Sequence, residues 1–165
     1  MTDPLAGIYN YRRLRDMLST SGQPGEAELA AIAEAGFEVV INLGLADAEY
    51  ALPDERGSVE RLGMDYLHIP VLWEAPSAED LDRFIAAMQS LEGRQVFVHC
   101  AANKRVSTFI ALYRIAALGW PRETALGEIR AIWEPNAIWQ RFMDTELSRC
   151  VASLRPGTRP RTGTP

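Results

Sequence analysis

The chain has little of what disulfide-rich, zinc-binding or membrane-spanning proteins need. Its 165 residues include two cysteines, Cys100 and Cys150, and two histidines, His68 and His99. Two cysteines argue against a disulfide framework, and this set is too small for a convincing zinc site, so we expect no metal and no cofactor. No stretch is apolar and long enough to span a bilayer, and the N-terminus lacks a signal-peptide core. We therefore expect a cytoplasmic protein without a membrane partner.

Positive charge is also scarce. Lys and Arg number 17 against 22 Asp and Glu, a formal net charge of −5. No broad basic surface for nucleic acid is therefore expected. The one basic run, in residues 155–161, lies among Pro, Gly and Thr and predicts a flexible tail over residues 155–165. The length predicts one domain in residues 1–154, and the oligomeric state stays open.

Helical and strand-like patterns alternate along the chain. Alternation of this kind predicts an α/β fold, with a mostly parallel central sheet of about four to five strands flanked by helices. Cys150 lies within the last predicted helix and is interpreted as a buried small apolar residue. The patterns predict strands in residues 37–43, 66–71 and 95–98, and helices in residues 25–35, 77–88, 107–118, 121–133 and 136–154.

Cys100 follows the third predicted strand where the chain turns into a helix. Such a turn aims backbone N–H groups into one concavity, and the positive end of the helix dipole favours a thiolate there. Asn103 suits a left-handed turn position, because Asn is among the non-glycine residues that tolerate it best. We expect an anion-binding loop formed by Ala101, Ala102, Asn103, Lys104 and Val106.

Other side chains near Cys100 are expected to support it. Ser107 can donate a hydrogen bond to the thiolate. Lys104 and Arg105 add positive charge. His99 is expected to orient the loop and tune the thiolate rather than act as a base.

The segment from His99 to Thr108 resembles the signature loop of the cysteine-dependent protein tyrosine and dual-specificity phosphatases. That loop runs His-Cys, five residues, Arg, then Ser or Thr. The resemblance implies a phosphatase-like fold in which Cys100 attacks a phosphate monoester, either a phosphoprotein or a small phosphorylated molecule. Upstream segments are similar to small bacterial phosphatase-like domains in residues 19–24, 34–37, 39–43 and 68–71.

The family also uses an aspartate on a loop about 25 to 35 residues before the cysteine, as the acid that protonates the leaving oxygen. Here the resemblance makes Glu74 the best candidate, with Asp80 and Asp82 as alternatives whose helical positions favour capping and surface roles. Trp73 either shapes the mouth of the pocket or packs against the core.

The match departs from the family pattern at the arginine. Val106 occupies the usual arginine position, and Arg105 stands one residue early. A shift of one residue at a helix start rotates a side chain by about 100°. Arg105 therefore cannot form the same bidentate clamp unless the loop is rebuilt. If the loop has the family's geometry, Val106→Arg is expected to raise phosphatase activity.

The shorter spacing leaves two other hypotheses open. Residues 100–105 also resemble the loop of rhodanese-like sulfurtransferases, with Asn103 in place of glycine, which implies a persulfide on the cysteine. The replacement at Val106 also fits a catalytically weak phosphatase-like domain that binds phosphorylated partners.

Overall fold

The computed structural model describes residues 2–153, so the predicted tail lies outside the described residues. A five-stranded sheet has the order β1-β2-β5-β3-β4, and only the β1–β2 pair is antiparallel. This arrangement confirms the predicted α/β fold. The strands are β1 (Arg12–Arg15), β2 (Leu18–Ser21), β3 (Val39–Asn42), β4 (Asp65–His68) and β5 (Val96–His99).

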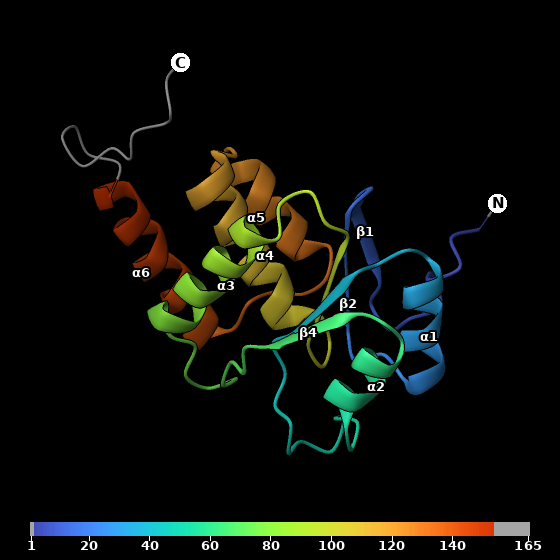
Figure 1. Cartoon of the computed structure of the whole chain (residues 1–165). Helices are drawn as coiled ribbons and strands as arrows, with labels where there is room; N and C mark the ends of the chain where they lie inside the picture. Colours follow the sequence, from blue (N-terminus) through green and yellow to red (C-terminus); the bar gives the residue numbers. More distant parts are fainter. Residues whose placement is uncertain (1, 154–165) are drawn as a thin grey trace.

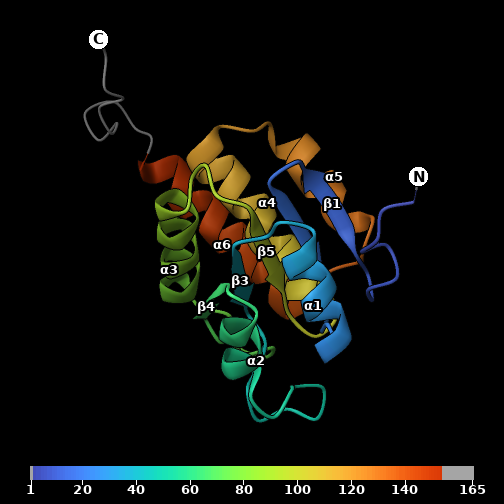
Figure 2. The same ribbon diagram turned by 45° about the vertical axis from the view of Figure 1, so that its right-hand side comes forward.

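Helices cover both faces of this sheet. Helices α1 and α2 lie on one side, and α3, α4, α5 and α6 lie on the other (Figures 1 and 2). Within residues 2–153, none of these helices is both long and apolar enough to cross a membrane. Their bounds are α1 Glu26–Glu34, α2 Glu55–Arg61, α3 Ala78–Ser90, α4 Lys104–Leu118, α5 Arg122–Arg130 and α6 Ala137–Ser153.

The core has two parts because successive strand residues point to opposite faces. On β5, Val96 and Val98 pack on the side of α4, whereas Phe97 packs on the side of α1. The next two residues continue the alternation, so His99 faces α2 and Cys100 faces α4. His99 and Cys100 are adjacent in sequence but therefore lie on opposite faces of the sheet.

Helix α4 lies at the centre of the larger layer. Its residues from Arg105 to Arg114 are all buried, as its apolar composition predicts. It packs against α3, α5 and α6, and its first turn faces the carboxyl ends of the parallel strands. Ligand sites in open α/β sheets form at this edge.

The first residues of the predicted helices 77–88 and 136–154 act as capping residues. The Ser77 hydroxyl accepts from the Asp80 amide at 3.1 Å, and the Asn136 side chain accepts from the Trp139 amide at 3.0 Å. The predicted strands and long helices lie where expected, although α4 begins at Lys104, three residues early. The predictions missed β1, β2 and α2.

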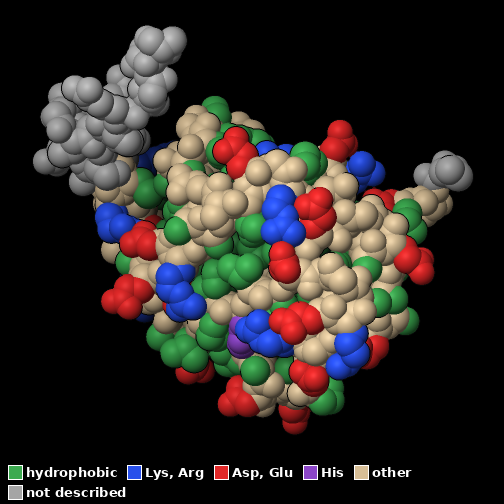
Figure 3. Space-filling view, viewed as in Figure 1, with side chains coloured by type: hydrophobic (Ala, Val, Ile, Leu, Met, Phe, Trp, Pro, Cys, Tyr) green, Lys and Arg blue, Asp and Glu red, His purple; other side chains and the backbone are tan. Residues whose placement is uncertain are grey.

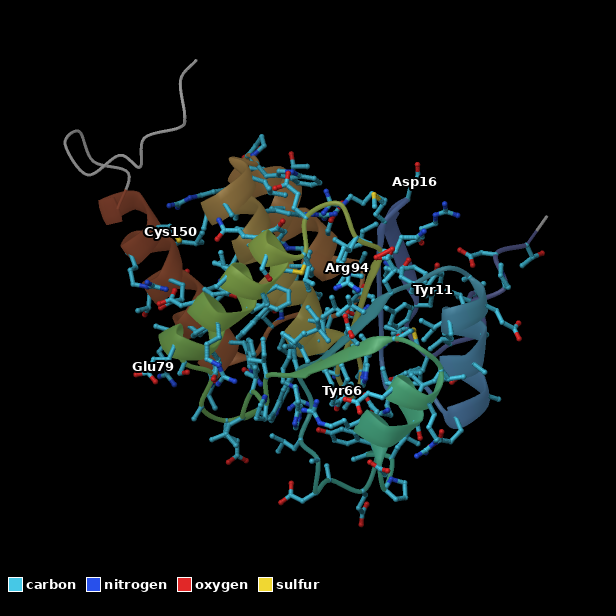
Figure 4. The ribbon with its side chains drawn as sticks, in the orientation of Figure 1. Tyr11, Asp16, Tyr66, Glu79, Arg94 and Cys150 are labelled. Atoms are coloured by element: carbon cyan, nitrogen blue, oxygen red, sulfur yellow. The ribbon has the colours of Figure 1, made fainter. Side chains whose placement is uncertain are left out.

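Acidic and basic side chains are interspersed over the face seen in Figure 3, with no wide area of one sign. Cys150, on α6 (Figure 4), is half-buried rather than fully buried, and its burial raises the pKa of the thiol. A raised thiol pKa disfavours the reactive thiolate. Cys100 is therefore the cysteine on which the site is built.

Candidate active site

The loop after β5 turns sharply into α4. Its turning residue, Asn103, adopts a left-handed conformation with φ of 63° and ψ of 8°, as predicted. The Asn103 amide nitrogen Nδ2 donates to Asn10 O at 2.9 Å and to Thr20 Oγ1 at 3.0 Å. These two hydrogen bonds connect the turn to the N-terminal segment and to β2, and they fix the position of the loop.

The loop carbonyl groups bond to partners outside the loop. Ala101 O accepts from the Gln23 amide at 3.0 Å, and Ala102 O accepts from Asn10 Nδ2 at 3.0 Å. Since C=O and N–H point in opposite directions across a trans peptide, the Ala102 amide faces away from Gln23. The first amides of α4, including those of Lys104 and Arg105, have no acceptor within the helix. The loop therefore presents free N–H groups to an anion.

A pocket of about 300 Å³ opens above this loop. Cys100 is only 1% exposed, yet it lines the floor of this pocket rather than being sealed in the core. Two basic side chains share the pocket with the thiol, and its other walls are mostly apolar. The lining residues are Leu45, Tyr50, Trp73, Cys100, Ala101, Ala102, Lys104 and Arg105.

Arg105 and Val106 point in different directions. Arg105 lines the pocket while Val106 is completely buried in the core beneath α4. The Arg105 guanidinium donates to Val71 O at 2.8 Å and to the Tyr50 hydroxyl at 3.1 Å. Arg105 is 5% exposed and is fixed by these bonds. The guanidinium group of this loop thus reaches the pocket from position 105, one residue before the position that carries the arginine in the family pattern.

The Lys104 side chain lies beside the pocket and packs against two tryptophan rings. Its Nζ is 6.0 Å from the centre of the Trp73 ring and 5.7 Å from that of Trp133. Trp73 is itself held by Trp139, whose Nε1 donates to Trp73 O at 2.9 Å. Cation–π attraction keeps the ammonium group near the pocket while leaving its protons available to a ligand.

His99 forms a buried pair that the sequence did not reveal. Its Nε2 donates to Glu55 Oε2 at 2.6 Å, and its Nδ1 lies 3.3 Å from Cys100 O. Both ring nitrogens therefore face oxygen atoms. Gln23 Nε2 donates to the other Glu55 oxygen at 2.8 Å. The predicted orienting role of His99 now has a physical basis in Glu55, at the first turn of α2.

Glu55 is almost fully buried, and burial alone would raise its pKa. The hydrogen bond and charge of His99 outweigh that effect, so the pKa of Glu55 lies below its ordinary value. Beside it, burial raises the pKa of Tyr66 to about 12. Tyr66 lies on β4 at the α2 side (Figure 4), where Asn42 Nδ2 donates to its hydroxyl at 3.0 Å. The carboxylate of Glu55 thus lies in a buried polar network that includes His99, Gln23 and Tyr66.

Two predicted side chains are placed away from Cys100. The Ser107 hydroxyl donates to Lys104 O at 2.9 Å instead of to the thiolate. Glu74 is exposed, and it is not among the residues that line the pocket, although its neighbour Trp73 is. Asp80 and Asp82 pair with Arg83 and Arg149 on the surface. The structure therefore brings Cys100, the loop, Lys104, Arg105 and His99 together, and the roles of Ser107 and Glu74 stay predictions.

Comparison with known proteins agrees with this geometry. Residues 11–138 match the family model described as DSP-PTPase phosphatase fused to NAD+ kinase. The chain belongs to this phosphatase family. A solved relative, a putative phosphatase (DUF442) from Shewanella putrefaciens CN-32, is 34% identical, with a TM-score of 0.79 over 88% of this chain and 95% of that one.

Two further proteins are similar to this DSP-PTPase chain, one in sequence over part of its length and one in fold. The beta-lactamase hydrolase-like protein of Xylella fastidiosa is 30% identical over 105 residues, which are 62% of this chain and 24% of that protein. The chain thus spans about a quarter of that relative. P. aeruginosa TpbA in complex with pTyr shares the fold, at 18% identity and a TM-score of 0.65 over 96% of this chain and 92% of that one.

Proposed function

We propose that this protein is a cysteine-dependent phosphatase that hydrolyses phosphate monoesters through a phosphocysteine intermediate on Cys100. The observation that carries the proposal is the joint placement of Cys100, free loop amides and the Arg105 guanidinium around one pocket. The matching family description and the Shewanella putrefaciens protein are both named as phosphatases, which supports this proposal over a persulfide on Cys100.

In the proposed reaction, the Cys100 thiolate attacks phosphorus and displaces the ester oxygen. Free loop amides, including those of Lys104 and Arg105, stabilise the equatorial phosphoryl oxygens, and the Lys104 and Arg105 side chains supply positive charge. Water then attacks the phosphocysteine, which releases inorganic phosphate and restores the thiolate. His99 holds the loop through Glu55, and Ser107 is proposed to assist departure of the thiolate once it turns from Lys104 O.

The pocket favours a substrate whose phosphate carries a flat or apolar group. Tyr50 and Trp73 form its walls, and phosphate alone would leave most of the roughly 300 Å³ unfilled. TpbA, which shares the fold, was crystallised with pTyr. We propose a phosphorylated protein or a small phosphate ester as the substrate, with the protein acting in the cytoplasm.

The experiment compares the wild-type protein with Cys100→Ser and Cys150→Ser on 4-nitrophenyl phosphate. We expect turnover by the wild type and by Cys150→Ser, and a loss of more than about 1,000-fold in Cys100→Ser. Rapid acid quenching with a labelled aryl phosphate should trap phosphate on Cys100. Equal rates for the wild type and Cys100→Ser would refute the proposal.

A second candidate function is binding of phosphorylated partners without efficient turnover. Two observations favour it: Val106 replaces the usual arginine, and no carboxylate lines the pocket. Vanadate or phosphate bound in the pocket without any release of 4-nitrophenol would support this function. Failure to bind any oxyanion would exclude both candidates.

A further inference from the structure

The lining of the pocket includes no carboxyl group that could protonate the leaving group of a phosphatase reaction. None of its eight lining residues is an aspartate or glutamate, and the predicted acid Glu74 is exposed outside it. An alkoxide or phenoxide is a poor leaving group, and a positioned proton donor accelerates its departure. The guanidinium of Arg105 does not give up a proton in proteins. The lining side chains to consider as proton donors are therefore Tyr50 and Lys104.

The Tyr50 hydroxyl has an unusual set of partners. It accepts from the Leu45 amide at 2.8 Å and from Arg105 Nη2 at 3.1 Å. A backbone amide and a guanidinium are both obligate donors, so both lone pairs of the phenolic oxygen are occupied. Within residues 2–153 the hydroxyl proton meets no acceptor. Its acceptor must therefore come from outside the chain, as water or as an oxygen of the substrate.

The surrounding backbone fixes the Tyr50 ring in this place. A methyl group at Gly44 would lie 3.1 Å from Tyr50 Cε1 and 3.2 Å from its hydroxyl oxygen. A side chain at position 44 would crowd the ring, so glycine lets the ring approach this closely. The Arg105 guanidinium lies 6.0 Å from the ring centre. Tyr50 is therefore held rigidly on the pocket wall, as catalytic geometry requires.

We propose that Tyr50 is the general acid of this site, donating its hydroxyl proton to the leaving oxygen of the phosphate ester. This inference rests on the proposed phosphatase function. It assigns to a tyrosine the task that the family gives to an aspartate. Lys104 is the less suitable proton donor, because loss of its proton would also remove the cation–π attraction to Trp73 and Trp133 that holds it.

The proton balance closes over the two steps. As the Cys100 sulfur forms its bond to phosphorus, the P–O ester bond breaks and the leaving oxygen takes the Tyr50 proton. The phenolate that remains is stabilised by Arg105 at 3.1 Å. In the second step the phenolate takes a proton from the attacking water, the S–P bond breaks, and inorganic phosphate leaves. Tyr50 and Cys100 both return to their starting states.

The test exploits leaving groups that differ in their need for a proton. Wild type, Tyr50→Phe and Glu74→Gln are compared on 4-nitrophenyl phosphate, whose leaving group departs readily, and on phenyl phosphate, whose leaving group does not. In Tyr50→Phe we expect kcat/KM to fall roughly 100- to 10,000-fold on phenyl phosphate, the usual contribution of a general acid, and less than about tenfold on 4-nitrophenyl phosphate. In Glu74→Gln the ratio of the two rates should match the wild type.

The outcomes separate the alternatives. Equal losses on both substrates in Tyr50→Phe would mean that Tyr50 only positions Arg105, and would overturn the proposal. A selective loss on phenyl phosphate in Glu74→Gln would return the acid role to Glu74. If the wild type is inactive on both esters, the proposed function itself fails.

A second measurement covers the case in which Tyr50→Phe does not fold. Site-specific 3-fluorotyrosine at position 50 keeps the hydroxyl and its two bonds but makes the phenol more acidic. The ionisable groups around it are Arg105, Lys104 and Cys100. We expect the alkaline limb of kcat/KM to move to lower pH, and an unchanged limb would contradict the proposal.

Discussion

The buried pair of Glu55 and His99 yields a quantitative prediction for Glu55→Gln. The substitution keeps the size of the side chain but removes the charge that faces His99 Nε2 at 2.6 Å. A hydrogen bond to a charged group contributes about 1.5–3 kcal/mol to stability. We take the upper value, about 3 kcal/mol, because the Glu55 carboxylate is almost fully buried. For a domain of this size that loss lowers Tm by roughly 6–12 °C.

The pH dependence of this effect has a defined sign. The pKa of Glu55 in the folded protein lies below 4.5, its ordinary value. The carboxylate therefore stabilises the fold fully above about pH 4.5, and that stabilisation is lost as the pH falls through the lower, folded-state pKa. The difference between the wild type and Glu55→Gln should be largest near pH 7 and should shrink in acid.

Urea unfolding at pH 7 and at a series of acidic pH values measures both quantities. Glu60→Gln is the matched control, because Glu60 lies on the same helix, is exposed and pairs with Arg56 on the surface. It should change the free energy of unfolding by less than about 0.5 kcal/mol. A Glu55→Gln protein as stable as the control at pH 7, or a difference that does not depend on pH, would refute the reasoning.

Two further substitutions probe the loop. Val106→Arg should destabilise the fold by several kcal/mol and give no gain in activity, because it forces an unpaired guanidinium into a core site of zero exposure. A variant that is well folded and more active than the wild type would contradict this prediction. Gly22→Ala places a methyl group 2.6 Å from Ala101 O and 2.7 Å from Tyr9 Cδ2, so the loop backbone must shift. We expect kcat/KM to fall at least about tenfold, measured on 4-nitrophenyl phosphate, and unchanged kinetics would show that the loop tolerates the shift.

The elements that the sequence predicted best are those with a strong local pattern. The β-branched run in residues 37–43 predicted β3, and Ser77 and Asn136 marked helix starts that the structure confirms. Strand β1 has the sequence Arg-Arg-Leu-Arg and is mostly exposed, so it shows no apolar alternation. It exists because it pairs with β2 at the edge of the sheet, a tertiary effect that no local pattern records.

The site was predictable only in part, for the same reason. Cys100 and Asn103 are found from the strand–turn–helix pattern, which is local. Glu55 lies 44 residues before His99 and begins a short helix that contains a glycine and no apolar stripe. One signal was available: the chain has only two histidines, and a buried one needs an acceptor. That requirement points to a carboxylate but cannot say which of the 22 acidic residues supplies it.

Helix geometry explains why Arg105 lines the pocket while Val106 lies in the core. Because adjacent helical residues differ by about 100° in direction, a helix whose first turn buries Val106 must turn Arg105 toward the pocket side. The arginine then approaches along the wall formed by Val71 O and the Tyr50 hydroxyl. A cation held at that wall orders the tyrosine beside it, in a pocket whose lining includes no carboxylate. Because Arg105 donates to the Tyr50 hydroxyl, Arg105→Lys should impair the same protonation step as Tyr50→Phe.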